Sequence, residues 1–169
     1  TEIRRLIEII KSLDRKVVTI FLAVAILQTF SFYFTSRRFF RANLFEQFEN
    51  YSDPYLLEYL YWFIGDFFTF FILGIAVIKF GLKEKLSEYG LQFGDFKVGV
   101  KISLIFLSVM IILIWFVSAT PAFAEKYPHL SNAKSDWNTL LVYESGMLLY
   151  MFAWEFIWRG FMLFGLEKR

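Results

Sequence analysis

The chain has 169 residues, of which 57% are hydrophobic and 22% are aromatic, and its formal net charge at pH 7 is +2. A soluble domain usually has about 45–50% apolar residues, so this composition favours a membrane protein. The chain has no cysteine and a single histidine, His129. That excludes a disulfide framework and a zinc site built from His and Cys, and the small net charge gives no reason to expect a nucleic-acid partner.

The first sixteen residues alternate charged and apolar side chains with helical spacing. Apolar residues recur every three or four positions, which is typical of one face of a helix, and the basic residues lie mostly off that face. We therefore predict an amphipathic helix over 1–16. Such a helix can lie in the membrane interface or pack on other protein, and the sequence leaves both possibilities open.

The remainder, 17–169, is predicted to be an all-α, polytopic transmembrane helix bundle. Each of its apolar runs is about as long as the twenty residues that a membrane-spanning helix needs. Asp53-Pro54 predicts the start of the second helix, and Asp136 or Asn138 could cap the fourth. The predicted spans are 17–36, 59–80, 98–119 and 139–166.

The basic residues predict the orientation of these spans. The N-terminal arm, the second connector and the C-terminal residues together contain more than twice as many Lys and Arg residues as the other two connectors. The positive-inside rule then places both ends in the cytoplasm of a multi-pass cell-membrane protein. Because the chain begins with Thr and ends shortly after the fourth span, we expect it to be truncated at its C-terminus.

Ionisable groups inside apolar spans are costly and rarely occur without a role. Glu155 and Arg159 are four residues apart, so a helix brings them together on one face, and we expect a buried ion pair facing a water-accessible pocket. Glu144 lies about three turns before Glu155 and could face the same seam. Asp66, in the second span, could bond a hydroxyl group of a neighbouring helix or line a wet cavity.

The segment WEFIWRGFM at 154–162 resembles the motif of the CAAX-processing and bacteriocin-processing family (CPBP, or Abi) of intramembrane proteases. That motif has two Glu residues, three further residues and an Arg, commonly followed by Gly. Aligning Arg159 with the motif Arg places Glu155 on the second Glu and Trp154 on the first. Residues 89–97 are similar to the connector that many family members have before the next span.

The resemblance implies a membrane-embedded endopeptidase that hydrolyses a membrane-associated peptide or protein, in contact with the lipid bilayer. Glu155 would activate water and Arg159 would orient it or balance its charge. Trp154 and Trp158 would shape the binding pocket, and Glu144 is a further binding candidate. No metal or cofactor site is predicted within this chain, although the resemblance leaves metal-assisted hydrolysis open for a full-length protein.

The sequence also departs from the family pattern. Trp154 replaces the first Glu, and the histidines that later family motifs contribute are absent. The alternative hypothesis is therefore a non-catalytic pseudoprotease that acts as a membrane scaffold or a bacteriocin-immunity protein. A third hypothesis is a small transporter in which Asp66, Glu144 and Glu155 relay protons.

Overall fold

A computed structural model describes residues 14–127 and 129–167. Within these residues the chain is entirely helical, which confirms the all-α prediction. Four helices are long and apolar enough to cross a membrane, so the protein is a multi-pass membrane protein by this criterion: Arg15–Asn43, Pro54–Leu82, Phe96–Ser118 and Trp137–Glu167. The predicted amphipathic helix over 1–16 lies almost wholly outside the described residues.

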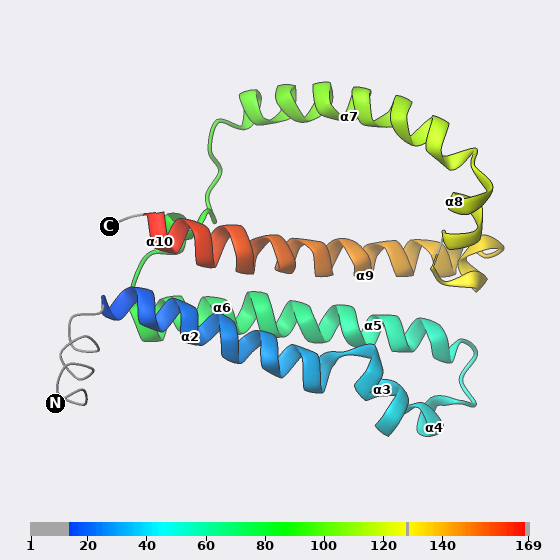
Figure 1. Ribbon diagram of the computed structural model, residues 1–169, viewed down its shortest axis with the longest axis horizontal. Coiled ribbons are helices and arrows are strands. Elements are labelled where there is room, and N and C mark those ends of the chain that lie inside the picture. Colours follow the sequence, from blue (N-terminus) through cyan, green and yellow to red (C-terminus); the bar gives the residue numbers. More distant parts are fainter. Residues whose placement is uncertain (1–13, 128, 168–169) are drawn as a thin grey trace, which may run out of the picture. The chain divides into compact units, whose positions relative to one another are not determined.

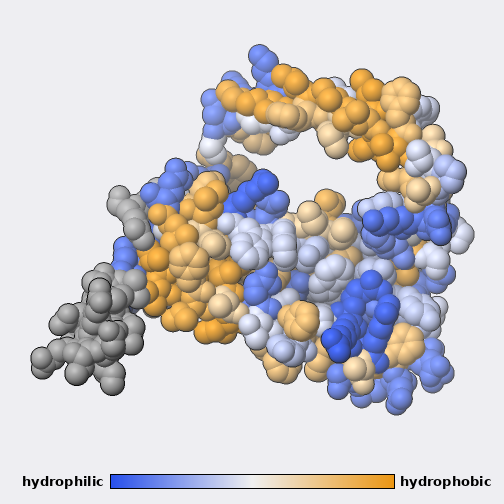
Figure 2. Space-filling model, in the orientation of Figure 1, coloured by the Kyte–Doolittle hydropathy of each residue, from blue (hydrophilic) through white to orange (hydrophobic). Residues whose placement is uncertain are grey.

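The first of these helices bends at Ser36. Helix α2 (Arg15–Phe30) continues into a π-helical segment, η1 (Ser31–Thr35), and the backbone of Ser36 is extended, with ψ at 153°. The Ser36 hydroxyl then accepts a hydrogen bond from the Phe39 N–H at 3.3 Å and caps α3 (Arg37–Asn43). The basic segment thus forms its own short helix, followed by α4 (Phe45–Phe48). Hydrophilic residues gather over α3 and α4 in Figure 2.

The second helix begins where the sequence predicts. Asp53 Oδ1 accepts a hydrogen bond from the Leu56 N–H at 2.9 Å, and Pro54 occupies the first turn, where its missing N–H costs nothing. Its segments in chain order are α5 (Pro54–Asp66), η2 (Phe67–Ile72), α6 (Leu73–Ala76) and η3 (Val77–Leu82). A connector with a 3₁₀ turn, η4 (Leu86–Tyr89), ends at Gly90, whose φ of 80° suits glycine.

Residues Gln92–Tyr143 form one of two compact units. This unit contains α7 (Phe96–Ser118), α8 (Pro121–Lys126), η5 (Ser131–Lys134) and the first turns of α9 (Trp137–Glu155). All residues of α7 are exposed and most are apolar, as Figure 2 shows, which suits contact with lipid. Asp136 caps α9: hydrogen bonds from the Thr139 side chain and N–H lower the pKa of its carboxyl group.

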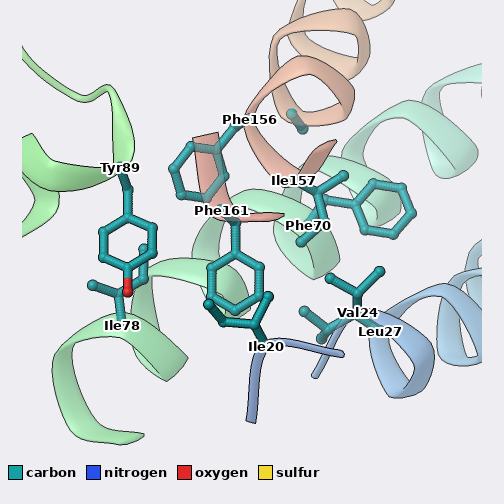
Figure 3. Close-up of a cluster of buried hydrophobic side chains, with 10 residues drawn as sticks. Ile20, Val24, Leu27, Phe70, Ile78, Tyr89, Phe156, Ile157 and Phe161 are labelled. Carbon is teal, nitrogen blue, oxygen red and sulfur yellow. The ribbon is translucent and has the colours of Figure 1, made fainter. Parts of the chain in front are cut away.

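The other unit comprises the described residues up to Leu91 and those from Glu144 onward. In it α2 and the second helix pack against the end of α9, the π-helical segment η6 (Phe156–Phe164) and α10 (Gly165–Glu167). These helices run side by side in Figure 1. Their buried side chains form one core, most of which Figure 3 labels: Ile20, Val24, Leu27, Phe70, Ile78, Tyr89, Ala153, Phe156, Ile157 and Phe161.

Gly160 lies where η6 meets the connector. A Cβ atom at this position would lie 2.8 Å from the Tyr89 carbonyl oxygen and 2.9 Å from the Phe156 ring. Both distances are too short for a real contact, and the first is to backbone that cannot rotate away. The glycine after the motif Arg is therefore explained by packing within this unit.

We predict that Gly160→Ala lowers the free energy of unfolding by about 1–3 kcal/mol, as overpacked positions usually do. Gly99→Ala is the control, because nothing lies within 4 Å of a Cβ at Gly99; this change should be neutral or slightly stabilising, since alanine favours helix. Unfolding in mixed detergent micelles measures both. Equal stability of the two variants would contradict the packing explanation.

Tyr89 links the connector to the start of α2. Its hydroxyl donates a hydrogen bond to Glu84, and Lys16 Nζ lies 2.8 Å from Glu84 Oε2. Burial of the phenol, together with the hydrogen bond and the negative charge of Glu84, raises the pKa of Tyr89 above its ordinary value. The folded protein therefore favours the neutral phenol.

A raised pKa in the folded state gives stability that is complete below the unfolded pKa of about 10 and is lost as the pH rises above it. We expect the wild-type protein to lose more stability than Tyr89→Phe between about pH 9 and pH 11. The Lys16–Glu84 pair is present in both proteins, so the difference between the two curves isolates Tyr89. Parallel curves would mean that Tyr89 ionises as freely in the folded protein as in the unfolded chain.

Candidate functional site

Asp66 is the centre of a buried polar cluster between the first two long helices. Its side chain is 2% exposed. Ser31 Oγ and Thr35 Oγ1 donate hydrogen bonds to Oδ1 at 2.6 and 2.5 Å, and Trp62 Nε1 donates to Oδ2 at 2.8 Å. The sequence-based expectation that Asp66 bonds a hydroxyl of a neighbouring helix is confirmed.

The local backbone brings these groups together. Ser31 and Thr35 both lie in the π-helical segment η1, and Asp66 directly precedes the π-helical segment η2. Such segments are often found at functional sites. Gly65 permits the close approach of the two helices, because a Cβ there would lie 2.6 Å from the Thr35 Cβ atom.

An open cavity of about 400 Å³ lies beside this cluster, within one compact unit. Asp66 lines it together with aromatic side chains of three long helices and with two arginines that follow the first apolar run. The residues most relevant to its chemistry are Asp66, Trp62, Tyr150, Trp154, Arg37 and Arg38. Asp66 thus lines a cavity, as the second expectation for it has it, and the presence of water there stays a prediction.

Glu58 is a second buried acid of α5, and it is fully buried. Arg37 Nε lies 2.5 Å and Arg41 Nε 2.9 Å from Glu58 Oε1, and the Arg37 guanidinium lies 3.7 Å from the centre of the Tyr59 ring. The sequence predicted that the first span ends at residue 36, directly before these arginines, and indicated no other role for them. A usable signal was present, because Arg37 and Arg41 are four residues apart and a helix places them on one face.

Glu155 and Arg159 do form the predicted ion pair. Arg159 Nε lies 2.9 Å from Glu155 Oε2, and Glu155 directly precedes the π-helical segment η6. The pair is not buried, however: its side chains are 73% exposed for Arg159 and 46% exposed for Glu155. The expectation of a buried pair is wrong, because the apolar neighbours of Glu155 in sequence point to other faces of the helix.

Trp154 and Trp158 face the interior more than Glu155 does. Trp154 lines the cavity of Asp66 and packs against Tyr150 and Trp158, with ring centres 6.1 and 5.7 Å away. The Trp158 Nε1 atom is buried and has no hydrogen-bond partner. The position that corresponds to the first Glu of the family motif thus lies at the cavity, whereas Glu155 does not line it.

Glu144 is exposed at the start of the part of α9 that belongs to the same unit as Glu155. It does not line the cavity beside Asp66. His129 is also exposed, with its ring 4.7 Å from the Tyr127 ring centre. Among the residues that the structure describes, no three His, Cys, Asp or Glu side chains gather in a group that could hold a metal ion.

We predict that Arg37→Gln lowers the free energy of unfolding by about 1.5–3 kcal/mol, the usual worth of a hydrogen bond to a charged group, because it removes one partner of the buried Glu58 carboxylate. Arg38→Gln is the matched control: Arg38 is exposed, so the change should stay within about 0.5 kcal/mol. Reversible unfolding in mixed micelles checks both. If both variants lose a similar amount of unfolding free energy, the ion pair between Arg37 and Glu58 contributes no more to stability than an exposed arginine does.

Comparison with known proteins finds no relative of this chain. No protein-family model, no curated protein and no solved structure matches the chain. The chain is therefore characterised by its fold and its site, as a multi-pass helical membrane protein with a buried carboxylate cluster and a surface Glu-Arg pair.

Proposed function

We propose that this protein is a membrane-embedded endopeptidase of CPBP type that hydrolyses a membrane-associated peptide or protein. The observation that carries the proposal is the Glu155–Arg159 pair, at 2.9 Å, within a segment that resembles the family motif. The half-exposed Glu155 carboxylate is open to water and substrate, and the ion pair with Arg159 holds it in place.

The chemistry follows from how this pair is arranged. Arg159 holds Glu155 Oε2, and Oε1 is left to accept a proton. In the proposed reaction Oε1 takes a proton from water while the water oxygen bonds to the carbonyl carbon of the scissile peptide. The C–N bond then breaks, and the proton passes to the leaving amine. Arg159 stays paired with Oε2 and holds the carboxylate in place throughout.

The proposal also assigns roles to residues near Glu155 and Arg159. Trp154 and Trp158 shape the apolar wall beside Glu155, and Glu144 remains a binding candidate on the same helix. The protein would lie in the cell membrane with its N-terminus in the cytoplasm, as the basic residues predict. Whether a full-length protein adds a metal to the reaction is left to experiment.

The alternative proposal is a non-catalytic pseudoprotease that serves as a membrane scaffold or a bacteriocin-immunity protein. The observation that favours it is the packing of Trp154. This side chain fills the position of the first motif Glu and packs against the aromatic rings of Phe70, Tyr150 and Trp158. A side chain held in this way contributes to stability and offers no proton acceptor.

The test uses the natural full-length protein, reconstituted with membranes from cells that lack it, and identifies newly formed protein N-termini by mass spectrometry. We expect Glu155→Gln to reduce cleavage by at least about a hundredfold, the usual contribution of a general base. Glu125→Gln is the control, because Glu125 is an exposed acid of α8 in the other compact unit; it should cleave like the wild type.

Two outcomes would contradict the protease proposal. One is the absence of any new N-terminus with the wild-type protein while it assembles normally. The other is unchanged cleavage by Glu155→Gln. The first outcome, combined with full biological function of Glu155→Gln in cells, would establish the scaffold alternative.

A further inference from the structure

The Asp66 carboxylate lacks a cationic partner. No Lys, Arg or His nitrogen of the described residues lies within 4.0 Å of it. Its neighbours Ser31, Thr35 and Trp62 all donate hydrogen bonds to it, so both of its oxygen atoms act as acceptors. A carboxylate can accept about four hydrogen bonds, so one acceptor position is left, and Asp66 lines the open cavity.

Aromatic rings border the cavity next to this carboxylate. Trp62 and Tyr150 have ring centres 4.7 Å apart, and Trp154 lies 6.1 Å from Tyr150. All three residues line the cavity. Aromatic faces attract organic cations, and clusters of them are a recurrent way to bind alkylammonium groups. The acid and the rings therefore favour an ammonium group at this end.

Basic side chains also line this cavity. Arg37 and Arg38 both line it, but Arg37 is held by Glu58. Arg38 is exposed, and no acid of the described residues pairs with it. Apart from Arg37, the cavity is thus lined by one acid, Asp66, and one basic side chain, Arg38, each without an ion-pair partner among those residues. A ligand with one charge of either sign would leave the other unpaired, whereas a zwitterion would pair both.

We propose that this cavity binds a zwitterion that carries an alkylammonium group and a phosphate group, of the phosphocholine or phosphoethanolamine kind. The ammonium group lies at Asp66 against the Trp62, Tyr150 and Trp154 rings, and the phosphate group lies at Arg38. The cavity volume of about 400 Å³ is within the usual range of ligand sites. The proposal does not depend on hydrolysis at Glu155.

This chemistry occurs in a free metabolite and in the head group of a zwitterionic phospholipid. Arg38 follows the first predicted span, 17–36, and Asp66 lies within the second, 59–80, so we expect the cavity to extend from the level of the head groups into the membrane. Arginine at that level is well placed to bind phosphate. The two sources are separated by experiment.

The first experiment titrates the protein, purified in an uncharged maltoside detergent, with phosphocholine, choline or inorganic phosphate, and follows binding by calorimetry. We expect phosphocholine to bind at least about tenfold more tightly than either fragment, because a hydrogen bond to a charged group is typically worth this much. Arg38→Gln should weaken phosphocholine binding at least about tenfold and leave choline binding nearly unchanged. Lys134→Gln, in the other compact unit, is the control.

The second experiment places the protein in nanodiscs of phosphatidylglycerol, with or without added phosphatidylcholine, and measures Trp fluorescence. Saturation by phosphatidylcholine without binding of free phosphocholine identifies the lipid head group; binding of both leaves the free metabolite as a ligand. Asp66→Asn, which keeps the acceptor oxygen and removes the charge, should abolish selection for ammonium. If this variant does not fold, Trp154→Phe, which should weaken choline binding, replaces it. Absence of binding in both systems, or equal binding by wild type and Arg38→Gln, would overturn the proposal.

Discussion

Two carboxylates of helix α5, Glu58 and Asp66, are buried, and each is bound by side chains of the preceding helical segment. Polar groups within apolar helices must find partners inside the protein, since hydrocarbon offers none. Arg37 and Arg41 both pair with Oε1 of Glu58, while Ser31 and Thr35 donate hydrogen bonds to Asp66. These interactions fix the register of the first helix against the second, because a shift by one residue would leave both acids without partners.

The same interactions produce the cavity. The backbone of η1 places Ser31 and Thr35 next to Asp66. The bend at Ser36 places Arg37 and Arg38 at the cavity, near the start of the second helix. Gly65 lets the two helices approach closely enough for these hydrogen bonds to form. A cavity that brings aromatic rings next to a buried acid is thus a consequence of how the apolar helices of this unit bury Asp66.

The Glu-Arg segment presents two different surfaces. Adjacent residues on a helix point about 100° apart, so Trp154 faces the cavity and Glu155 faces outward with Arg159. The resemblance to a protease motif concerns the outward surface, and the zwitterion site concerns the inward one. Gly160 serves neither surface; it allows the connector carbonyl of Tyr89 to lie against the helix. One helix can therefore carry the proposed ligand site and the proposed hydrolytic pair on different faces.

The sequence by itself determined the all-helical class, the number of candidate spans and the cap at Asp53, because these depend on local composition and on hydrogen bonds between residues close in the chain. It left Asp136 and Asn138 open as the cap of the fourth helix, and the structure shows that Asp136 is the cap. It also predicted the Glu155–Arg159 pair from spacing alone. Only the tertiary structure decided which side of the helix that pair occupies, and which arginines meet Glu58. Burial depends on residues far apart in sequence, and an acid within an apolar run has the same pattern whether it faces a neighbouring helix or the surface.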